Sequence, residues 1–365
     1  MVVYIRADAS QQMGSGHVMR CLTLALKLRE MGARVNFICR AHTGHLIDYI
    51  KNHGFDIHSL PIGSQRQAPN SLDLPPHLGW LGVSWEEDAQ QCCEILKKEQ
   101  VEWLVVDHYA IDARWEKALG PYTRRIMVID DLADRPHQCD LLLDQNYTTN
   151  MGERYRELIP IESRPLLGPR YALLRNEFFQ ARKNLLERTG YIKRIIVFFG
   201  GSDLGNQTAK ALEALDMLYR PDIIVDVVVG ASNPNKDYIR MLCVKKDNVN
   251  FYCQVEYMAS LMVSADLLLG AGGANLWERC ILALPSISLI LADNQREVTH
   301  AVAAMGATWN LGWGDEVNTY DINKALTRAL KHPNELALMG QRAAGLMGDT
   351  TLCGTDLVAK ALEWD

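Results

Sequence analysis

The apolar residues of this 365-residue chain fall in short runs that alternate with amphipathic segments from one end to the other. In the first half, apolar runs predict strands at residues 2–6, 34–39, 55–60, 101–107, 125–129 and 139–144. Apolar residues spaced three and four apart predict helices at 17–31, 45–52 and 85–98. Strands that are apolar throughout and alternate with helices are typical of parallel sheets covered by helices.

The same alternation restarts in the second half, with predicted strands at 193–199, 223–229, 250–253, 267–269 and 286–291. Charges and three prolines interrupt residues 151–190, which we interpret as a linker and bridging region. The length exceeds that of a usual single core. We therefore predict an N-terminal domain at 1–150 and a C-terminal domain at 191–365, whose last helix could pack back on the first. The predicted fold is α/β, with two Rossmann-like doubly wound domains facing a cleft.

Composition excludes several classes of protein. The net charge of −6 argues against a general nucleic-acid binder, which needs a basic face. No uninterrupted apolar run is long enough to predict a membrane span, and the N-terminus lacks the pattern of a signal peptide. The nine cysteines contain no Cys-x-x-Cys pair, so reduced thiols are favoured over disulfides or zinc. These features predict a cytoplasmic protein.

A glycine turn follows the first predicted strand and leads into the first helix. Gly14, Ser15 and Gly16 lie where free N–H groups of the helix start could bind an anion or a developing oxyanion. A dinucleotide site is disfavoured, because Met19 replaces the third glycine and Arg40 stands where an acidic residue would bind ribose. A turn with no binding role remains the alternative.

His17 is the strongest single candidate for a catalytic residue, although most lone histidines are structural or solvated. It follows the glycine turn at a helix start, where the helix dipole favours a neutral ring that can act as a general base. Asp8 could orient His17, cap the helix or bind a sugar hydroxyl. Further polar residues end two neighbouring strands and predict a common rim, with ordinary loop polarity as the alternative: Asp107, His108, Tyr109, Asp130 and Asp131.

The second half contains glycine turns suited to a diphosphate held by backbone N–H groups. The candidate residues are Gly200, Gly201, Ser202, Gly272, Gly273, Ala274 and Asn275. Glu278 could accept hydrogen bonds from ribose hydroxyls, and Asn294 and Gln295 precede another helix. No Asp-x-Asp sequence occurs, which argues against a metal-dependent sugar transferase. We therefore predict neither a metal nor a cofactor.

Several of these segments resemble one family. Residues 6–8 and 14–21 resemble the N-terminal signature of the UDP-2,4-diacetamido-2,4,6-trideoxy-β-L-altropyranose hydrolases of pseudaminic acid biosynthesis. Residues 106–109, 144–146, 167–174, 272–280 and 292–295 are also similar to that family. The C-terminal motifs alone are similar to the wider glycosyltransferase-B group, which includes the peptidoglycan N-acetylglucosaminyltransferases.

The resemblance implies a glycosyltransferase-B fold, UDP in the C-terminal half, no metal, and water in place of a sugar acceptor. It implies that His17 is essential and that Tyr109 lies near the sugar. With Asp8, these form the expected catalytic set. The expected substrate contacts are Gly14, Ser15, Gly16, Arg20, Asp107, His108, Asp131, Asn294 and Gln295. The family also implies a surface glycan, such as that of flagellin, as the destination of the sugar. The long loop at 63–82 matches nothing in the family pattern.

These observations predict direct displacement at the anomeric carbon with inversion, in which His17 activates the water. A glycosyltransferase of the same fold is the nearest alternative. A non-catalytic UDP-sugar sensor and, less favoured, a nicotinamide-dependent epimerase are the others. The expected partner is a small UDP-sugar, without nucleic acid or membrane, and a monomer is favoured.

Overall fold

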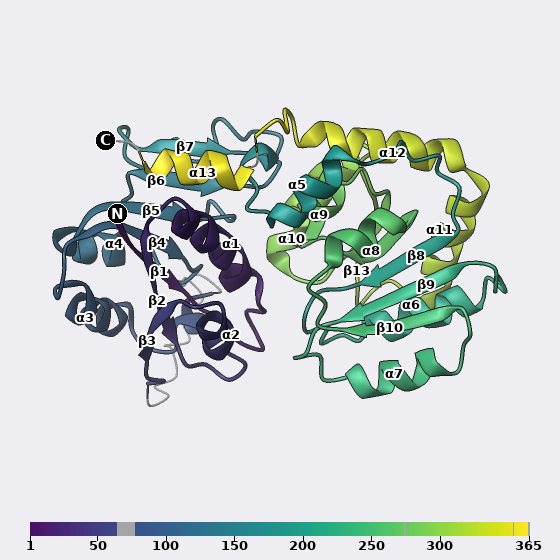
Figure 1. Cartoon of the computed structure of the whole chain (residues 1–365), viewed down its shortest axis with the longest axis horizontal. Helices are drawn as coiled ribbons and strands as arrows, with labels where there is room; N and C mark the ends of the chain where they lie inside the picture. The colour runs from purple at the N-terminus through teal and green to yellow at the C-terminus, as the bar shows by residue number, and fades with distance from the viewer. Residues whose placement is uncertain (64–76, 274, 353, 364–365) are drawn as a thin grey trace. The chain divides into compact units, whose positions relative to one another are not determined.

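The computed structural model describes residues 1–63, 77–273, 275–352 and 354–363. It forms two compact units (Figure 1). Unit 1 comprises Met1–Asn146, Asn150–Leu173 and Gly354–Asp365, and unit 2 comprises Tyr147–Thr149 and Leu174–Cys353. The chain therefore passes between the units several times.

Unit 1 is built on a seven-stranded parallel sheet in the order β3-β2-β1-β4-β5-β6-β7. Its strands are β1 (Val2–Ala7), β2 (Arg34–Arg40), β3 (Asp56–Leu60), β4 (Val101–Asp107), β5 (Thr123–Ile129), β6 (Leu141–Asp144) and β7 (Arg164–Leu167). Alternate residues of the strands enter two different cores, with Ile5 in one and Tyr4 in the other. Both faces of the sheet are therefore covered, as the apolar strands predict.

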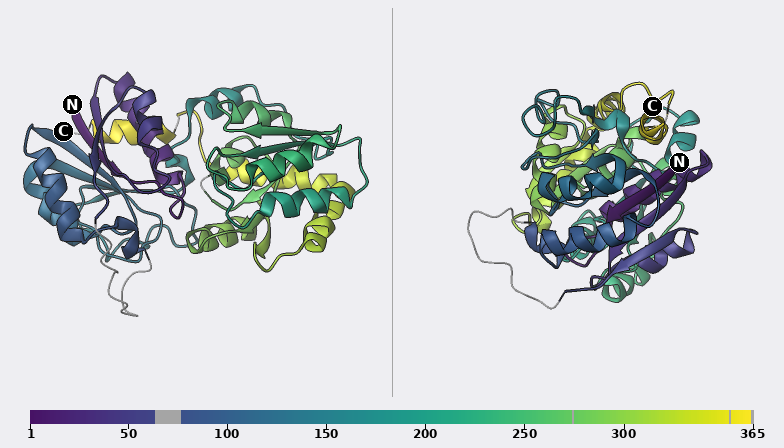
Figure 2. Two further views of the ribbon diagram at one scale, coloured as in Figure 1. Left: turned by 90° about the horizontal axis from the view of Figure 1, so that it is seen from below. Right: turned by 90° about the vertical axis from the view of Figure 1, so that its left-hand side faces the viewer.

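The helices of unit 1 form those two covers. They are α1 (Gly16–Glu30), α2 (Ile47–Asn52), η1 (Leu78–Leu81), α3 (Trp85–Leu96), α4 (Ala113–Leu119), η2 (Gly120–Tyr122), η3 (Pro169–Tyr171) and α13 (Gly354–Leu362). The last helix packs beside α1, where Lys27 Nζ lies 2.7 Å from Asp356 Oδ1. The indole of Trp103 donates to the carbonyl of Leu362 at 2.8 Å. Figure 2 accordingly shows α13, in yellow, close to the start of the chain.

Unit 2 repeats the design with six parallel strands in the order β10-β9-β8-β11-β12-β13. The strands are β8 (Arg194–Phe198), β9 (Ile224–Val229), β10 (Val249–Cys253), β11 (Leu267–Ala271), β12 (Ser286–Ile290) and β13 (Trp309–Trp313). The helices are α5 (Asn176–Lys183), α6 (Gln207–Asp216), α7 (Lys236–Val244), α8 (Met258–Ser264), α9 (Asn275–Ile281), α10 (Asp293–Ala304), α11 (Thr319–Lys331) and α12 (Pro333–Leu346). None of the helices described is long and apolar enough to cross a membrane.

In both sheets the strand order reverses direction between two central strands. The reversal lies between β1 and β4 in unit 1, and between β8 and β11 in unit 2. Ligands of doubly wound sheets bind beyond the carboxyl ends of the strands at such a reversal. The carboxyl ends of these four strands and the residues that follow them are therefore the expected ligand site, and they include His17, Asp107, Gly200 and Gly272.

Two strands, β7 and β13, were not predicted from the sequence. β7 lies inside residues 151–190, which the pattern assigned to a linker, and the residues up to Leu173 belong to unit 1. β7 is a four-residue edge strand with a proline, and edge strands tolerate a residue that cannot donate a hydrogen bond. β13 (WNLGW) is an edge strand too, interrupted by Gly312.

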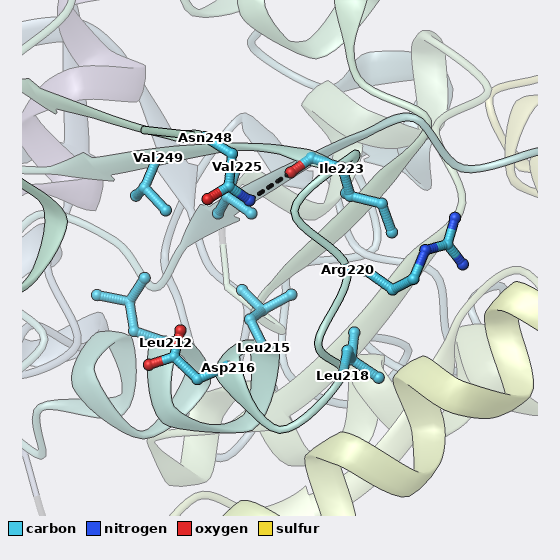
Figure 3. Close-up of a pocket in the computed structure, with 9 residues that line it drawn as sticks. All are labelled: Leu212, Leu215, Asp216, Leu218, Arg220, Ile223, Val225, Asn248 and Val249. Carbon is cyan, nitrogen blue, oxygen red and sulfur yellow. Dashed lines mark hydrogen bonds between the residues drawn. The ribbon is translucent and has the colours of Figure 1, made fainter. Parts of the chain in front are cut away.

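Unit 2 also contains a small cavity of about 30 Å³ (Figure 3). Leu212 and Leu215 of α6 line it together with Val225 and Val249. The two valines lie at the amino ends of β9 and β10, opposite to the ends at which parallel sheets bind ligands. This cavity therefore lies away from the end of the sheet where a nucleotide site is expected.

Candidate active site

His17 and Asp107 meet at the carboxyl ends of β1 and β4. His17 is the second residue of α1, and its Nδ1 lies 2.6 Å from Asp107 Oδ1. The carboxylate is fully buried and the imidazole almost so. Burial alone would raise the pKa of Asp107, but Arg20 and His17 outweigh it and hold the pKa well below its usual range. Because an ionised carboxylate only accepts hydrogen bonds, the proton of a neutral His17 lies on Nδ1. Nε2 then has a free lone pair.

Arg20 clamps this arrangement from one turn further along α1. Its Nε and terminal nitrogen reach the two oxygens of Asp107 at 2.6 and 2.7 Å. The other terminal nitrogen lies 2.6 Å from Asp131 Oδ2. The planar guanidinium suits such two-pronged contacts. Arg20 therefore holds Asp107 and Asp131 in place, and the substrate contact predicted for it from the sequence stays a prediction.

Tyr109 completes the group around His17. Its hydroxyl donates to Asp131 Oδ2 at 2.8 Å, and its ring meets the His17 ring edge-on at 4.5 Å. The rings of His77 and Trp80 lie 5.3 and 5.8 Å from it and cover it. Tyr109 is consequently only 2% exposed. Neither Trp80 nor its helix η1 was predicted, because the long loop at 63–82 has no periodic pattern. Residues 64–76 of that loop lie outside the described residues.

Asp8 does not orient His17, so that part of the sequence hypothesis is wrong. Its Oδ1 accepts from Arg6 at 2.6 Å and from the backbone N–H of Arg40 at 2.7 Å. Its Oδ2 lies 3.4 Å from Nε2 of His108. Asp8 has no exposed surface, and its contacts join the carboxyl ends of β1 and β2.

His108 is also turned inward, in contrast to the substrate contact expected from the sequence. Its Nδ1 accepts from the backbone N–H of Ala110 at 3.1 Å, so Nε2 carries the proton and faces Asp8. Burial lowers the pKa of His108, which favours this neutral ring. Arg6 also pairs with Asp88 at 2.8 Å. This buried ion network stabilises the carboxyl ends of the strands that carry the polar residues of the site.

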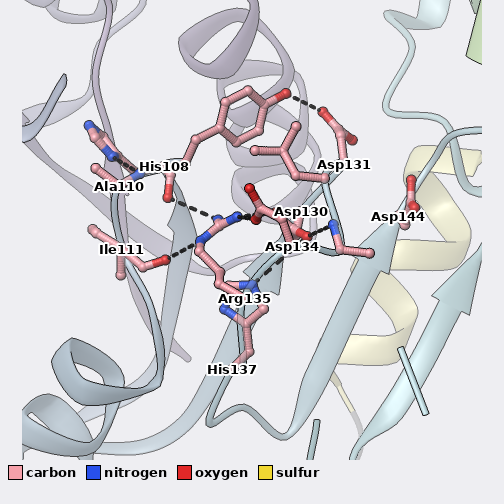
Figure 4. Close-up of polar contacts among 12 residues, drawn as sticks. His108, Ala110, Ile111, Asp130, Asp131, Asp134, Arg135, His137 and Asp144 are labelled. Carbon is pink, nitrogen blue, oxygen red and sulfur yellow. Dashed lines mark hydrogen bonds and ion pairs between the residues drawn. The ribbon is translucent and has the colours of Figure 1, made fainter. Parts of the chain in front are cut away.

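A second polar network lies behind Asp131 (Figure 4). Asp130 pairs with Arg135 at 2.9 Å, and His137 pairs with the buried Glu116 at 2.7 Å. Burial lowers the pKa of His137, but Asp130 and Glu116 outweigh it and raise that pKa to about 9. Asp130 is thus committed to structure, whereas Asp131 faces Arg20 and Tyr109.

Asp144 at the end of β6 is unusual among these acids. The Tyr155 hydroxyl lies 3.0 Å from Asp130 Oδ2 and 3.1 Å from Asp144 Oδ2. A hydroxyl has one proton, so it satisfies both oxygens only if one carboxyl group is protonated. Burial raises the pKa of Asp144 to about 8, with a further contribution from Asp131. The pKa of Asp130 is lowered, so Asp144, whose Oδ2 also lies 3.2 Å from Arg154 Nε, is the acid of the two that takes up a proton more readily.

The glycine turn before His17 is open. Gly14 has a φ of +74°, which favours glycine, and a side chain at Gly14 or Gly16 would meet nothing within 4 Å. Ser15 caps α1 without a side-chain hydrogen bond, and the first turn of α1 contains no acidic residue. The free N–H groups of this 15-residue helix are thus available beside the His17 ring.

In unit 2, the glycine turns after β8 and β11 are places of close backbone approach. Gly200 has a φ of +93°, and a Cβ on Gly272 would lie 1.9 Å from Thr299 Oγ1. Gly201 packs against Gly230, while Ser202 precedes Asp203, whose carboxylate caps α6 through Gln207 and Thr208. The predicted contact at Ala274 lies outside the described residues.

The helices after β11 and β12 position the remaining predicted residues. Asn275 begins α9, and its buried Oδ1 has no hydrogen-bond partner. Asn294 and Gln295 lie in the first turn of α10, where Gln295 lies beside Gly273 and accepts from the Leu291 N–H at 3.0 Å. Glu278 lies in α9 with its side chain 19% exposed, 3.6 Å from Arg175.

No group of His, Cys, Asp and Glu side chains in the described part of the chain is arranged to hold a metal ion. The eight cysteines within the described residues are free thiols.

Comparison with known proteins agrees with this architecture. Residues 195–348 match the family model of the glycosyltransferase family 28 C-terminal domain. The chain is 26% identical over 307 residues to the UDP-2,4-diacetamido-2,4,6-trideoxy-beta-L-altropyranose hydrolase of Campylobacter jejuni, covering 84% of this chain and 97% of that protein. It is 29% identical over 192 residues to the spore coat polysaccharide biosynthesis protein SpsG of Bacillus subtilis, covering 51% of this chain and 55% of that protein. The resemblance predicted from the sequence is confirmed.

Solved structures identify the fold. MurG of Acinetobacter baumannii superposes with a TM-score of 0.65 at 14% identity, covering 99% of each chain. A Streptomyces glycosyltransferase, SsfS6, superposes with a TM-score of 0.63 at 13% identity, covering all of each chain. The fold is of the glycosyltransferase-B type. The fold class predicted from the alternation of strands and helices is thereby confirmed.

Proposed function

We propose that this chain hydrolyses UDP-2,4-diacetamido-2,4,6-trideoxy-β-L-altropyranose to UDP and the free sugar. Its similarity to a hydrolase of that name over most of both chains supports an enzyme that acts on nucleotide sugars. The single observation that carries general base catalysis at this site is the 2.6 Å contact between His17 Nδ1 and Asp107. This contact leaves Nε2 as a base beside an open glycine turn.

In this proposal, the oxygen of a water molecule attacks the anomeric carbon from the face opposite the leaving group. The bond between that carbon and the β-phosphate oxygen breaks, and UDP leaves with the electron pair. His17 Nε2 takes the proton of the water, so the sugar is released with inverted configuration. General base catalysis of this kind contributes about 10²–10⁴-fold.

The other residues near His17 then have supporting roles. Asp107 orients the ring and stabilises the imidazolium that forms, and Arg20 fixes Asp107. Asp131 positions both Arg20 and Tyr109. Tyr109 lies near the sugar in this proposal and shields the reacting water together with Trp80.

Unit 2 would bind the UDP group. The glycine turns at 200–202 and 272–273 lie at the carboxyl ends of β8 and β11, where backbone N–H groups other than that of Gly272, which donates to the Leu289 carbonyl at 3.0 Å, can hold a diphosphate without a metal. Glu278 would accept hydrogen bonds from the ribose hydroxyls. A terminal phosphate has a second pKa of about 6, so UDP needs charge stabilisation more than a proton when it leaves.

The test is to incubate the purified protein with the UDP-sugar in a chelator, without any acceptor, and to follow UDP and the anomer of the free sugar. Release of UDP with inversion, lost in His17→Asn, is the expected result. Release that needs an added acceptor would instead identify a glycosyltransferase, the alternative favoured by the match to a glycosyltransferase C-terminal domain. Binding without turnover would identify a sensor.

A cytoplasmic location, a monomeric state and a role in pseudaminic acid biosynthesis for a surface glycan such as that of flagellin are part of the same proposal. Each follows from the sequence pattern or from the resemblance. Size-exclusion chromatography and the accumulation of the UDP-sugar in a deletion strain would test the last two.

A further inference from the structure

Arg175 and Glu278 form an ion pair within unit 2 that the proposed catalytic mechanism does not use. Arg175 precedes α5, and Glu278 lies in α9, against which α5 packs. Arg175 NH2 lies 3.6 Å from Glu278 Oε1, and the other terminal nitrogen lies 2.7 Å from Glu177 Oε1. The guanidinium thus lies between two carboxylates, one on its own helix and one at the predicted ribose position.

We infer that Arg175 is a positioning residue for nucleotide recognition: it holds Glu278 as an ionised acceptor aligned for the two ribose hydroxyls of UDP. The inference rests on the proposed UDP site. An ionised carboxylate accepts from two hydroxyls with both of its oxygens, whereas a protonated carboxyl group donates from one oxygen and accepts best with the other. Without a compensating cation, a carboxylate in a poorly hydrated place takes up a proton.

The charged groups around Glu278 show that its ionisation depends mainly on Arg175. Burial and the nearby Glu177 hold the pKa of Glu278 above its usual value even with Arg175 in place, and Arg175 is the largest influence that lowers it. Arg279 on the same helix also lowers it, but its guanidinium is fully buried and donates to Ser288 Oγ on the far side. Arg175 is the largest favourable influence and itself remains 30% exposed. A substitution there can be accommodated by solvent.

Further contacts of Arg175 depend on the shape of its guanidinium group. Arg175 NH1 donates to the carbonyl of Glu256 at 3.4 Å, and its Cζ lies 5.1 Å from the centre of the Phe178 ring. These contacts fix the guanidinium on the side of α5 that faces α9. A lysine would keep the charge but lose the planar fork that spans Glu177 and Glu278.

The experiment measures the affinity of the full chain for UDP and for 2′,3′-dideoxy-UDP by calorimetry at pH 6.5 and 8.5. Arg175→Gln should weaken UDP binding about three- to tenfold at pH 6.5, since a one-unit rise of a pKa changes the carboxylate population up to tenfold. Most of that loss should disappear at pH 8.5, and dideoxy-UDP should be unaffected at either pH. Arg175→Lys should lose less than Arg175→Gln. Lys183→Gln, an exposed change at the end of α5, is the matched control.

An equal loss for both nucleotides, or a loss independent of pH, would overturn the inference, because Arg175 would then act on folding or on the diphosphate. A loss in Arg175→Lys as large as in Arg175→Gln would also overturn the ionisation argument. If the unsubstituted protein binds neither nucleotide, the UDP site itself is wrong and the proposed function fails with it. If it binds UDP but Glu278→Gln has no effect, only the ribose assignment fails.

Discussion

Replacement of Asp107 by asparagine gives the most direct test of the site in unit 1. Asp107 Oδ1 contacts His17 and Arg20, and Oδ2 contacts Arg20 again. An amide group has one oxygen and one NH₂, so one of these sides must receive a donor. If the NH₂ faces His17, the ring must accept at Nδ1 and carry its proton on Nε2, which removes the base. If it faces Arg20 Nε, two donors oppose each other.

The size of both effects follows from these contacts. Asp107 is fully buried, so a donor left without an acceptor costs about 1–3 kcal/mol of unfolding free energy. Full removal of a buried ion-pair partner would cost about 3–5 kcal/mol, but Asp131 still pairs with Arg20. Loss of an oriented general base predicts a decrease in kcat of about 10²–10⁴-fold.

The assay combines kcat from UDP release with urea unfolding at the same pH. Asp48→Asn is the control, because Asp48 lies on α2 with a side chain 84% exposed. The double variant Asp107→Asn/His17→Asn should be no slower than His17→Asn alone, since the two residues act as a unit. If Asp107→Asn stays within about threefold of the original kcat while His17→Asn is inactive, the orienting role of Asp107 is refuted.

Three further changes test other parts of the structure. Asp144 has a raised pKa, so its carboxyl group holds a proton in the native state that it releases in the unfolded state. The free energy of unfolding should therefore fall as the pH rises from 5 to 6.5. Asp144→Asn should remove up to about 1.4 kcal/mol of that decrease per pH unit, measured by urea unfolding. Val225→Ile should fill the cavity of Figure 3 and stabilise the protein by about 0.5–1 kcal/mol in urea unfolding, whereas Val227→Ile, in the same core but away from the cavity, should not. Gly272→Ala should weaken UDP binding in calorimetry and cost about 1–3 kcal/mol, because its Cβ would clash with Thr299; Thr299→Ala should restore part of the stability. If the pH dependence of stability is unchanged in Asp144→Asn, the protonation of Asp144 is contradicted. Destabilisation by Val225→Ile would contradict the free space beside Val225. Unchanged stability of Gly272→Ala would contradict the close contact with Thr299.

Much of the fold was predictable because its signals are local. The apolar run at 101–107 coincides with β4, and the helix predicted after Gly16 coincides with α1 to within one residue at each end. The rule that ligand residues follow the carboxyl ends of parallel strands also brought His17, Asp107 and Tyr109 to one place. β7 could not be found this way, because its four residues contain a proline and an arginine.

The partner of His17 was not predictable from the pattern. Asp8 is closer in the sequence, but β1 pairs with β4 so that Ala7 lies opposite Asp107, and this register brings the Asp107 carboxylate to the ring. Register depends on tertiary pairing, which a single sequence does not display. Trp80 and Arg175 were missed for a related reason. Both lie in segments without periodicity, and only the folded chain places them beside Tyr109 and Glu278.

The last helix has a consequence for how the protein is made. Unit 1 begins the chain but includes α13, which packs beside α1 and accepts a hydrogen bond from Trp103. Unit 2 is nearly contiguous between 174 and 353. Every residue of unit 2 is therefore translated before the last helix of unit 1, so unit 1 cannot complete its fold first, in contrast to the usual N-terminal-first order. A stop codon just before Gly354 would thus remove α13 and destabilise unit 1, the domain that is translated first.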